Sequence, residues 1–205
     1  MVLSDEIRQD LEAQHEERLR RFRILVCIDG EDEGYRGLQY AARMGGARDD
    51  CDIILLYVRP IDQGLATGGL QVRVARENML RWGLELPGIR RLKKGLSMLV
   101  ADEEMEAEWA VVNSHTEIKG DPLGDHKIEY CHPSGRSIVL KLKVAPDVAS
   151  GILDQYELGP YNLIIMGSGS SGRGRLRAAL APNSAEKVAL HAPCGVLVAR
   201  DLVAG

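Results

Sequence analysis

Short apolar runs alternate with helix-like segments along most of the chain. Five runs of four to seven residues are mostly apolar, a pattern typical of strands that are buried on both faces of a sheet. These runs are residues 22–28, 52–58, 138–144, 163–166 and 195–200. Strands that alternate with helices predict an α/β fold with a parallel sheet, right-handed crossovers and helices on both faces.

The segments between these runs carry apolar residues at helical spacing. Tyr35, Leu38 and Ala41 fall on one stripe, and Gly45 and Gly46 provide a stop signal after it. Further helix-like segments follow Asp147 (with Val148, Ile152 and Tyr156 on one face) and cover residues 175–181 and 183–191. Each is predicted to pack on the sheet through its apolar side.

One connection is far longer than a crossover requires. About eighty residues separate Val58 from Ile138, whereas a crossover needs about a dozen. An insertion therefore occupies about residues 61–137, between the second and third strands. It contains a predicted helix around residues 74–86, a basic patch (Arg90, Arg91, Lys93 and Lys94), an acidic helix-like run at 101–108, and two segments, 111–118 and 127–131, that could pair as a hairpin around 121–124.

The first part of the chain predicts a helical extension. Residues 4–21 contain no glycine or proline, and their acidic residues come early and their arginines late, as a helix dipole prefers. Because apolar positions are few, we expect a solvated helix that lies loosely on the domain. The predicted organisation is an extension over residues 1–21 and one α/β domain over residues 22–201.

Composition and charge narrow the classes of function. The chain has 45% hydrophobic and 4% aromatic residues, a balance that favours helices layered on a sheet. Its formal net charge of −4 argues against a general nucleic-acid binder, which needs a surplus of cations on one face. The longest uninterrupted apolar run, residues 53–58, is far short of the ~20 residues that span a bilayer, so we expect a cytoplasmic protein without a membrane partner.

Side chains that bind metals are few and scattered. The four cysteines, Cys27, Cys51, Cys131 and Cys194, form no CxxC pair and indicate neither a disulfide framework nor a zinc ribbon. His126, Cys131 and His132 are close in sequence, but they lack a fourth ligand at a recognised spacing, so no metal is expected.

The strongest chemical signal is a glycine-rich segment, LIIMGSGSSGRGRL, at residues 163–176. At the carboxyl end of a parallel strand, a glycine-rich turn that enters a helix offers backbone N–H groups and a positive dipole end, and phosphate is the natural ligand. The plainer alternative is a flexible connector between strand and helix. No GxxxxGK[ST] pattern and no G-x-S-x-G alignment are present, which disfavours a P-loop ATPase and an α/β-hydrolase.

Residues 167–172 also satisfy G-x-G-x-x-G, the fingerprint of dinucleotide-binding folds. That reading predicts an NAD-type oxidoreductase. The fingerprint normally opens a long βαβαβ unit, however, and here only one strand-like run follows it. Asp201 comes after that strand, so the hypothesis stays open in second place.

Several segments together resemble the universal stress protein family in content and in order. They are ILVCIDGEDEGYRGLQYAARM, IILLYVRP and NLIIMGSGSSGRGRLRAALAPNSAEKVALHAPCGVLVAR, which cover about residues 22–60 and 138–201. The resemblance implies an open five-stranded parallel sheet in the order 3-2-1-4-5. It also implies a homodimer, often paired through the last strand, and a regulatory role in the stress response. Some members of the family bind ATP and others do not.

The pattern of the ATP-binding members is incomplete in this chain. It resembles G-x-x-G, nine residues, then G-[ST]; Gly169 to Gly172 supply the first half, but Pro182 and Asn183 stand at the second. Proline has no N–H, and a lost hydrogen bond to a charged group costs about 1.5–3 kcal/mol. Asn183 suits a helix N-cap, with Glu186 three residues on. The arginines at 173, 175 and 177 could compensate electrostatically, although a solvated helix face explains them too.

The resemblance and the loop together predict a site for an adenine nucleotide, AMP or ATP. Its candidate residues are Cys27, Asp29, Val58, Val144, Met166, Gly167, Gly169, Gly172, Asn183 and Ser184. Asp29 would accept hydrogen bonds from the ribose or from the adenine amino group, or would instead cap the following helix. Cys27, Val58 and Val144 would flank the adenine ring, although a role in the core explains them equally well.

No general acid and base are paired beside the loop in the sequence, so we expect at most slow ATP hydrolysis and not an efficient enzyme. The main alternative is a member of the family that has lost its nucleotide and acts as a dimeric interaction module.

Overall fold

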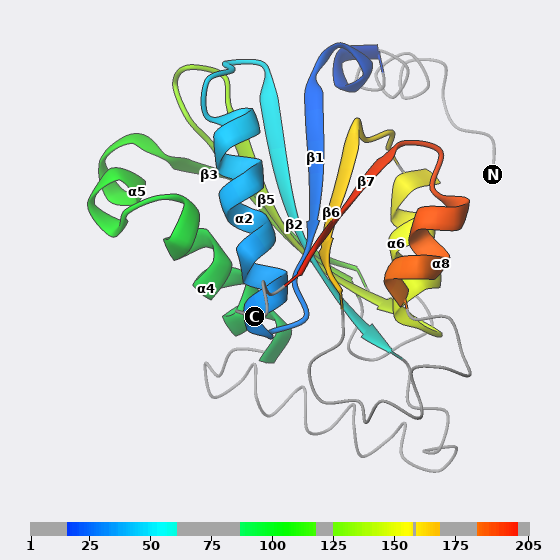
Figure 1. Cartoon of the computed structure of the whole chain (residues 1–205). Helices are drawn as coiled ribbons and strands as arrows, with labels where there is room; N and C mark the ends of the chain where they lie inside the picture. The colour runs from blue at the N-terminus through cyan, green and yellow to red at the C-terminus, as the bar shows by residue number, and fades with distance from the viewer. Residues whose placement is uncertain (1–15, 61–86, 118–124, 158, 169–183, 201–205) are drawn as a thin grey trace, which may run out of the picture.

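The structure is a computed structural model that describes residues 16–60, 87–117, 125–157, 159–168 and 184–200. These residues build one sheet with helices on both faces (Figure 1). The strands are β1 (Phe22–Cys27), β2 (Cys51–Pro60), β3 (Ala110–Glu117), β4 (Asp125–Cys131), β5 (Ser137–Ala145), β6 (Leu163–Gly167) and β7 (Gly195–Ala199). The helices are α2 (Asp32–Gly45), α4 (Pro87–Leu99), α5 (Asp102–Glu108), α6 (Val148–Glu157) and α8 (Ser184–His191).

Five strands form the predicted parallel sheet. β5, β2, β1, β6 and β7 lie side by side in that order, and every neighbouring pair among them is parallel. In order along the chain these are strands 3-2-1-4-5, so the predicted fold class and strand order are confirmed. The strand order reverses between β1 and β6. The chain therefore leaves the carboxyl ends of these two strands towards opposite faces of the sheet, and such a point in an open α/β sheet leaves room for a ligand.

The sheet is larger than predicted, with seven strands instead of five. The hairpin expected in the insertion is confirmed, because β3 and β4 pair antiparallel, with Ala110 opposite Cys131 and Glu117 opposite Asp125. β4 also pairs antiparallel with β5, so the hairpin continues the main sheet. Without it, β5 would be a long and largely apolar edge strand, which is prone to pair with other chains.

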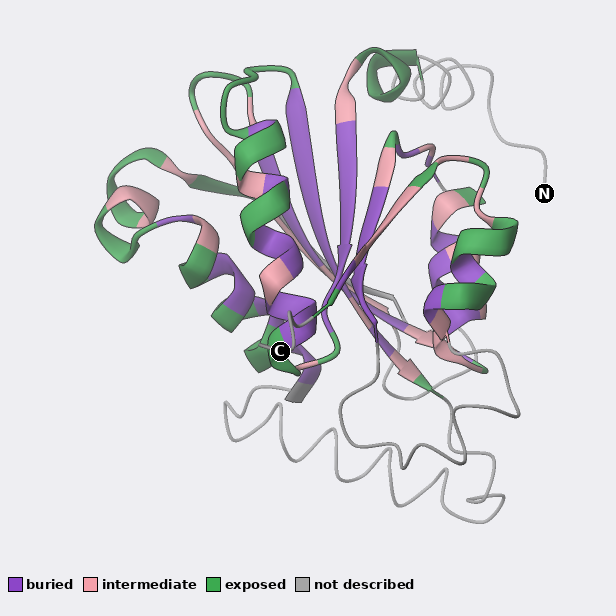
Figure 2. Ribbon diagram, viewed as in Figure 1, coloured by how far each residue is buried: buried purple, intermediate pink, exposed green. Residues whose placement is uncertain are grey.

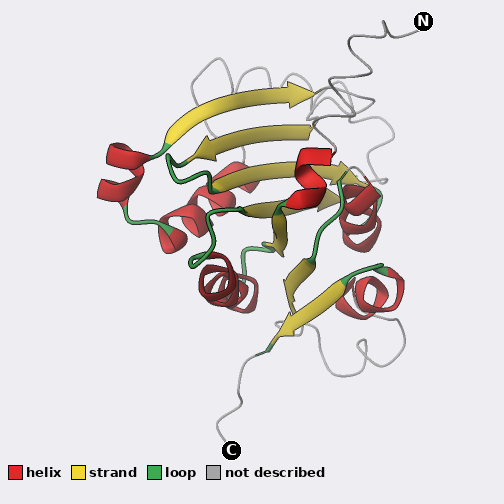
Figure 3. Cartoon of the chain, turned by 90° about the horizontal axis from the view of Figure 1, so that it is seen from above, coloured by secondary structure: helices red, strands yellow, loops and turns green. Residues whose placement is uncertain are grey.

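Two apolar layers cover the two faces of the sheet (Figures 2 and 3). Alternate residues of β1 divide between them: Ile24 and Val26 pack under α2 and α4, whereas Leu25 and Cys27 pack on the face that α6 and α8 cover. This alternation follows from the two-residue period of a strand. Both layers are wholly buried at β1, as expected for a central strand of a parallel sheet.

Helix α4 was not predicted as a helix. Only a basic patch was noted in this part of the sequence, and the structure places that patch on α4. Ile89, Leu92 and Leu96 of this helix are buried against the sheet. These apolar positions follow helical spacing, but the charged residues between them obscured the signal. The acidic run is α5, as predicted. The helices predicted at residues 74–86 and 175–181 lie outside the described residues.

Residues 16–20 are helical, and the rest of the predicted extension lies outside the described part of the chain. No helix in the described ranges is long and apolar enough to cross a membrane.

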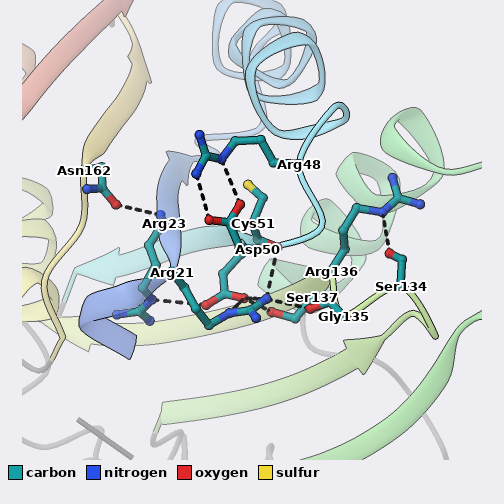
Figure 4. A network of polar contacts seen from close by, with 11 residues as sticks. Arg21, Arg23, Arg48, Asp50, Cys51, Ser134, Gly135, Arg136, Ser137 and Asn162 are labelled. Atoms are coloured by element: carbon teal, nitrogen blue, oxygen red, sulfur yellow. Dashed lines mark hydrogen bonds and ion pairs between the residues drawn. The ribbon is translucent and has the colours of Figure 1, made fainter. Parts of the chain in front are cut away.

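A carboxylate at the start of β2 joins the amino ends of three strands (Figure 4). Asp52 accepts a hydrogen bond from Arg21 Nε at 2.7 Å and another from Ser137 Oγ at 2.7 Å. Its other oxygen lies 3.4 Å from Arg23 Nε. The Asp52 side chain is only 10% exposed, so these charges interact with little solvent screening. Parallel strands are not joined by tight turns. In this protein the network around Asp52 links the amino ends of three strands through side-chain contacts.

The first prediction concerns this carboxylate. Replacing Asp52→Asn should lower the free energy of unfolding by about 3 kcal/mol, because it leaves two largely buried arginines without their counter-charge. Urea denaturation measures the change. The matched control is Asp50→Asn, which removes a carboxylate paired with Arg48 on the surface; it should leave stability unchanged within error. Equal effects of the two substitutions would contradict the assigned role of Asp52.

Candidate functional site

A cavity of about 310 Å³ opens at the carboxyl ends of β1, β2 and β6, on the face that α6 and α8 cover. Six of the ten predicted site residues line it: Cys27, Asp29, Val58, Met166, Gly167 and Ser184. The described lining also includes Glu31, Leu56, Tyr57, Ile152 and Ser168. The structure thus brings the end of β1 together with the end of β6 and the start of α8, which are remote from β1 in the sequence.

Asp29 follows β1 at the rim of the cavity. Its Oδ1 accepts a hydrogen bond from the Glu31 N–H at 2.9 Å, so the side chain closes a tight turn before α2. Glu31 is the N-cap residue of α2, and it makes no side-chain capping bond. Asp29 therefore orders the turn before the helix but is not its N-cap. Since the residue is exposed, its carboxylate can be reached from the cavity.

The end of β6 packs tightly against the first turn of α2. A Cβ atom on Gly167 would lie 2.9 Å from the backbone nitrogen of Gly34 and 3.1 Å from the carbonyl carbon of Glu33, so a side chain does not fit there. Ser168, the next residue, donates a hydrogen bond from its hydroxyl to the buried carboxylate of Glu33. Its N–H also bonds to the Ala199 carbonyl of β7 at 2.9 Å. The backbone that enters the glycine-rich segment is thus fixed on two sides.

One wall of the cavity is apolar. It is formed by Cys27, Leu56, Val58, Ile152 and Met166, all of which are buried. Burial, and to a smaller extent the charge of Asp29, raises the pKa of the Cys27 thiol well above its usual range. Cys27 is therefore a neutral thiol at physiological pH and belongs to the apolar wall, without nucleophilic character.

The structure does not bring Val144 to this cavity. Along β5, Leu140 and Leu142 face the layer under α4, whereas Val139 and Ala145 face the layer under α6. Val144 follows the first series by the two-residue period, so it lies on the face opposite to Cys27 and Val58. The described lining contains no residue of β5, so the prediction that Val144 lines this cavity is wrong.

The remaining predicted positions cannot be placed. Gly169, Gly172 and Asn183 lie outside the described residues, as do Pro182 and the arginines at 173, 175 and 177. The described residues on either side of them, Gly167 with Ser168 and Ser184, both line the cavity.

Sequence reasoning missed the contribution of the insertion to this site. Arg91 of α4 donates hydrogen bonds from Nη1 to the Asp29 carbonyl at 2.9 Å and to the Tyr57 hydroxyl at 2.8 Å. Gly30, at φ +97°, leaves room for this arginine, since a Cβ atom there would lie 2.6 Å from Arg91 Nε. The basic patch was visible in the sequence, but nothing local indicated that it reaches the end of β1.

The metal-capable residues of the insertion do not converge. His126 and Cys131 stand at opposite ends of β4, and His132 bonds to Glu108 through Nε2 at 2.7 Å. Within the described ranges, no three histidine, cysteine or acidic side chains are arranged to hold a metal ion.

A mixed, mainly parallel sheet with helices on both faces and a reversal of its strand order beside β1 defines an α/β protein of the doubly wound class. The model of the universal stress protein family matches residues 21–200. The chain belongs to this family.

One solved structure supports the fold, and others are similar to a lesser extent. A universal stress protein determined in complex with cAMP is similar at a TM-score of 0.50 and 12% identity, covering 88% of this chain and 97% of that one. Also similar are a universal stress protein from Archaeoglobus fulgidus (TM-score 0.47, 17% identity, 87% and 93% covered) and a family protein from Burkholderia pseudomallei (TM-score 0.46, 19% identity, 86% and 93% covered). No curated protein matches the chain.

The second prediction tests the contact between β6 and α2. Gly167→Ala should lower the free energy of unfolding by about 1–3 kcal/mol, because the new methyl group meets backbone atoms that cannot rotate away. The matched control is Gly195→Ala at the start of β7, where a Cβ atom would meet its nearest neighbour at 3.5 Å, an ordinary contact. Chemical denaturation compares the two. A Gly167→Ala protein as stable as the control would show that the close approach is not required.

Proposed function

We propose that this protein binds an adenine nucleotide, AMP or ATP, in the cavity at the carboxyl ends of β1, β2 and β6, and that it has a regulatory role in the cytoplasmic stress response. One observation carries the proposal. Gly167 lies in the first part of the glycine-rich segment and Ser184 comes after the segment in the chain, and both line the same cavity as Asp29. A ligand in this cavity would therefore meet the rim of β1 and both ends of the segment whose backbone suits phosphate.

The charges around the cavity favour one orientation of the nucleotide. Asp29 and Glu31, which line the cavity, are acidic; the neighbouring cation, Arg91, is bonded to the Asp29 carbonyl and the Tyr57 hydroxyl and is not part of the described lining. Phosphate would be repelled at the β1 rim, whereas ribose hydroxyls or the adenine amino group can donate to a carboxylate there. The nucleoside therefore lies towards Asp29 and the apolar wall, and the phosphates point towards Ser184, at the positive end of the α8 dipole.

A relative of the same fold supports this choice of ligand. The universal stress protein with a TM-score of 0.50 was determined in complex with cAMP, an adenine nucleotide.

We propose further that the protein holds its nucleotide and hydrolyses it slowly at most. Within the described lining, the two acids are not accompanied by a histidine or lysine, and Cys27 stays a neutral thiol. Efficient hydrolysis needs a positioned general base with a pKa near the working pH.

The partner we propose is a second copy of the chain, paired through β7. Among the described strands β7 ends the sheet, so one of its edges faces away from β6 and has no described strand paired to it. Its Val196, Leu197 and Val198 are only half-buried, and Leu190 just before it is 73% exposed. Sedimentation equilibrium should give the mass of a dimer, and a monomer at every concentration would contradict this pairing.

The third prediction tests the nucleotide. Freshly purified protein, denatured and extracted, should release AMP or ATP, and calorimetry should show that Asp29→Asn weakens binding by about 10- to 100-fold, because a charged acceptor is lost. Asp49→Asn, an exposed carboxylate in the loop before β2, is the matched control and should bind as the original chain does. After incubation with ATP, the bound nucleotide should remain mostly ATP.

The two alternative functions predict a different content of the extract from the denatured protein. No nucleotide in the extract and no binding by calorimetry would leave a dimeric interaction module. NAD in the extract would favour the oxidoreductase hypothesis. An equal loss of affinity in Asp29→Asn and Asp49→Asn would place the nucleotide elsewhere.

A further inference from the structure

A second and larger cavity, of about 590 Å³, lies at the opposite end of the sheet. It opens over the amino ends of β1, β2 and β5 and is bordered by α6, β4 and the turn that precedes β1. Figure 4 shows part of its wall, with Arg21 and Arg23 side by side and Ser137 beyond them. This cavity lies at the amino end of β1, whereas the proposed nucleotide site lies at its carboxyl end.

The wall of this cavity carries more positive than negative charge. Its described cations are Arg18, Arg21, Arg23, Lys127 and Lys141, and its described acids are Glu17, Asp52 and Glu129. Two of the acids are already engaged, because Asp52 is shared between Arg21 and Arg23, and Glu129 pairs with Lys127. One carboxylate cannot neutralise two guanidinium groups, so the described side chains of the wall carry a net positive charge.

A buried polar atom in the wall lacks a partner. Gln155 of α6 is 5% exposed, and its Nε2 donates to the Tyr161 hydroxyl at 2.8 Å. Its Oε1 makes no hydrogen bond within the described chain. Leaving a buried acceptor without a donor costs about 1–3 kcal/mol, and turning the amide over would only leave Nε2 unpaired instead. A hydroxyl group satisfies either orientation, since it both donates and accepts.

The cavity also offers carbon atoms to contact. Ile54, Val139 and Tyr161 contribute to its floor between the charged groups, and Arg23 lies over the Tyr161 ring with its Cζ 4.8 Å from the ring centroid. A hollow of this volume is larger than an inorganic ion fills. Its walls suit a molecule that has an anionic group, a hydroxyl group and a short carbon skeleton.

We propose that this cavity binds a small hydroxylated organic anion, held through its charge by the cationic wall and through its hydroxyl group by Gln155. A hydroxycarboxylate and the phosphate ester of a polyol share this chemistry. The site is independent of the proposed nucleotide cavity, so the two ligands bind without competing.

The test uses two pairs of probes with the purified full chain. Malate is compared with succinate, and glycerol 3-phosphate with inorganic phosphate, by calorimetry; in each pair only the first has a hydroxyl group on a carbon skeleton. At least one of the first members should bind saturably and about tenfold more tightly than its counterpart, the effect of one satisfied buried polar group. The pair that does so identifies the source of the anion.

Two variants and a control assign the binding to this cavity. Lys141→Gln should weaken the preferred probe about tenfold by removing a charge, and Gln155→Leu should abolish the preference for the hydroxylated member. The control, Arg43→Gln on the exposed face of α2, removes one positive charge elsewhere and should bind as the original chain does. Thermal unfolding of each variant verifies that it is folded.

Five results would overturn the proposal, of which the first four concern the probes and the two site variants. They are the absence of saturable binding by all four probes, equal binding with and without the hydroxyl group, binding that neither Lys141→Gln nor Gln155→Leu changes, and competition between the bound probe and AMP. An equal loss in Arg43→Gln would show a general effect of surface charge and would also overturn it. If no nucleotide binds, competition with AMP cannot be measured. The other four outcomes still decide whether the organic anion binds, so the two hypotheses fail separately.

Discussion

The sheet depends on a single carboxylate that gathers the amino ends of three strands. Parallel strands are joined by long crossovers, so no tight turn sets their register, and a slip of one residue would exchange the buried and exposed faces. Asp52 opposes Arg23 across β1 and β2 and Ser137 across β2 and β5, and it contacts both side chains. Arg21 adds a third contact just before β1. Most of the network is buried, so another register, which would separate these charged groups, would be unfavourable.

The register set at one end determines the chemistry at the other. Once Arg23 and Asp52 are opposed, the two-residue period places Cys27 and Leu56 on the face of α6 and α8, where they become the wall of the carboxyl-end cavity. The same period carries Val144 to the other face. β1 ends at Cys27, so Asp29 follows it at the rim, just before Gly30, which has a positive φ. The site is thus a consequence of strand pairing more than of any local motif.

Sequence reasoning succeeded where the signal is local and failed where it depends on contacts between distant segments. The five parallel strands and α2 were predicted because continuous apolar runs and one-sided stripes are local patterns. The pairing of β4 with the edge of β5 was not predicted, because edge pairing depends on which strand the fold leaves uncovered. Nor could the sequence place Arg91 at the Asp29 carbonyl, because α4 and β1 meet only in the folded chain. The prediction for Val144 failed because its position along β5 puts it on the face opposite to the cavity, and no residue of β5 is in the described lining.

The insertion contributes to both ends of the sheet, and the charged side chains in the described linings of the two cavities differ in sign. Arg91 of α4 braces the rim of the carboxyl-end cavity, where the described lining is acidic. Lys127 of β4 belongs to the amino-end cavity, where cations exceed acids. An acidic rim can hold an anionic ligand only if the anion is received by backbone amides and a helix dipole, whereas a cationic wall attracts it directly through side chains. The two proposed ligands would therefore be selected by different means, the nucleotide through backbone amides and a helix dipole and the organic anion through the charge and hydrogen bonding of side chains.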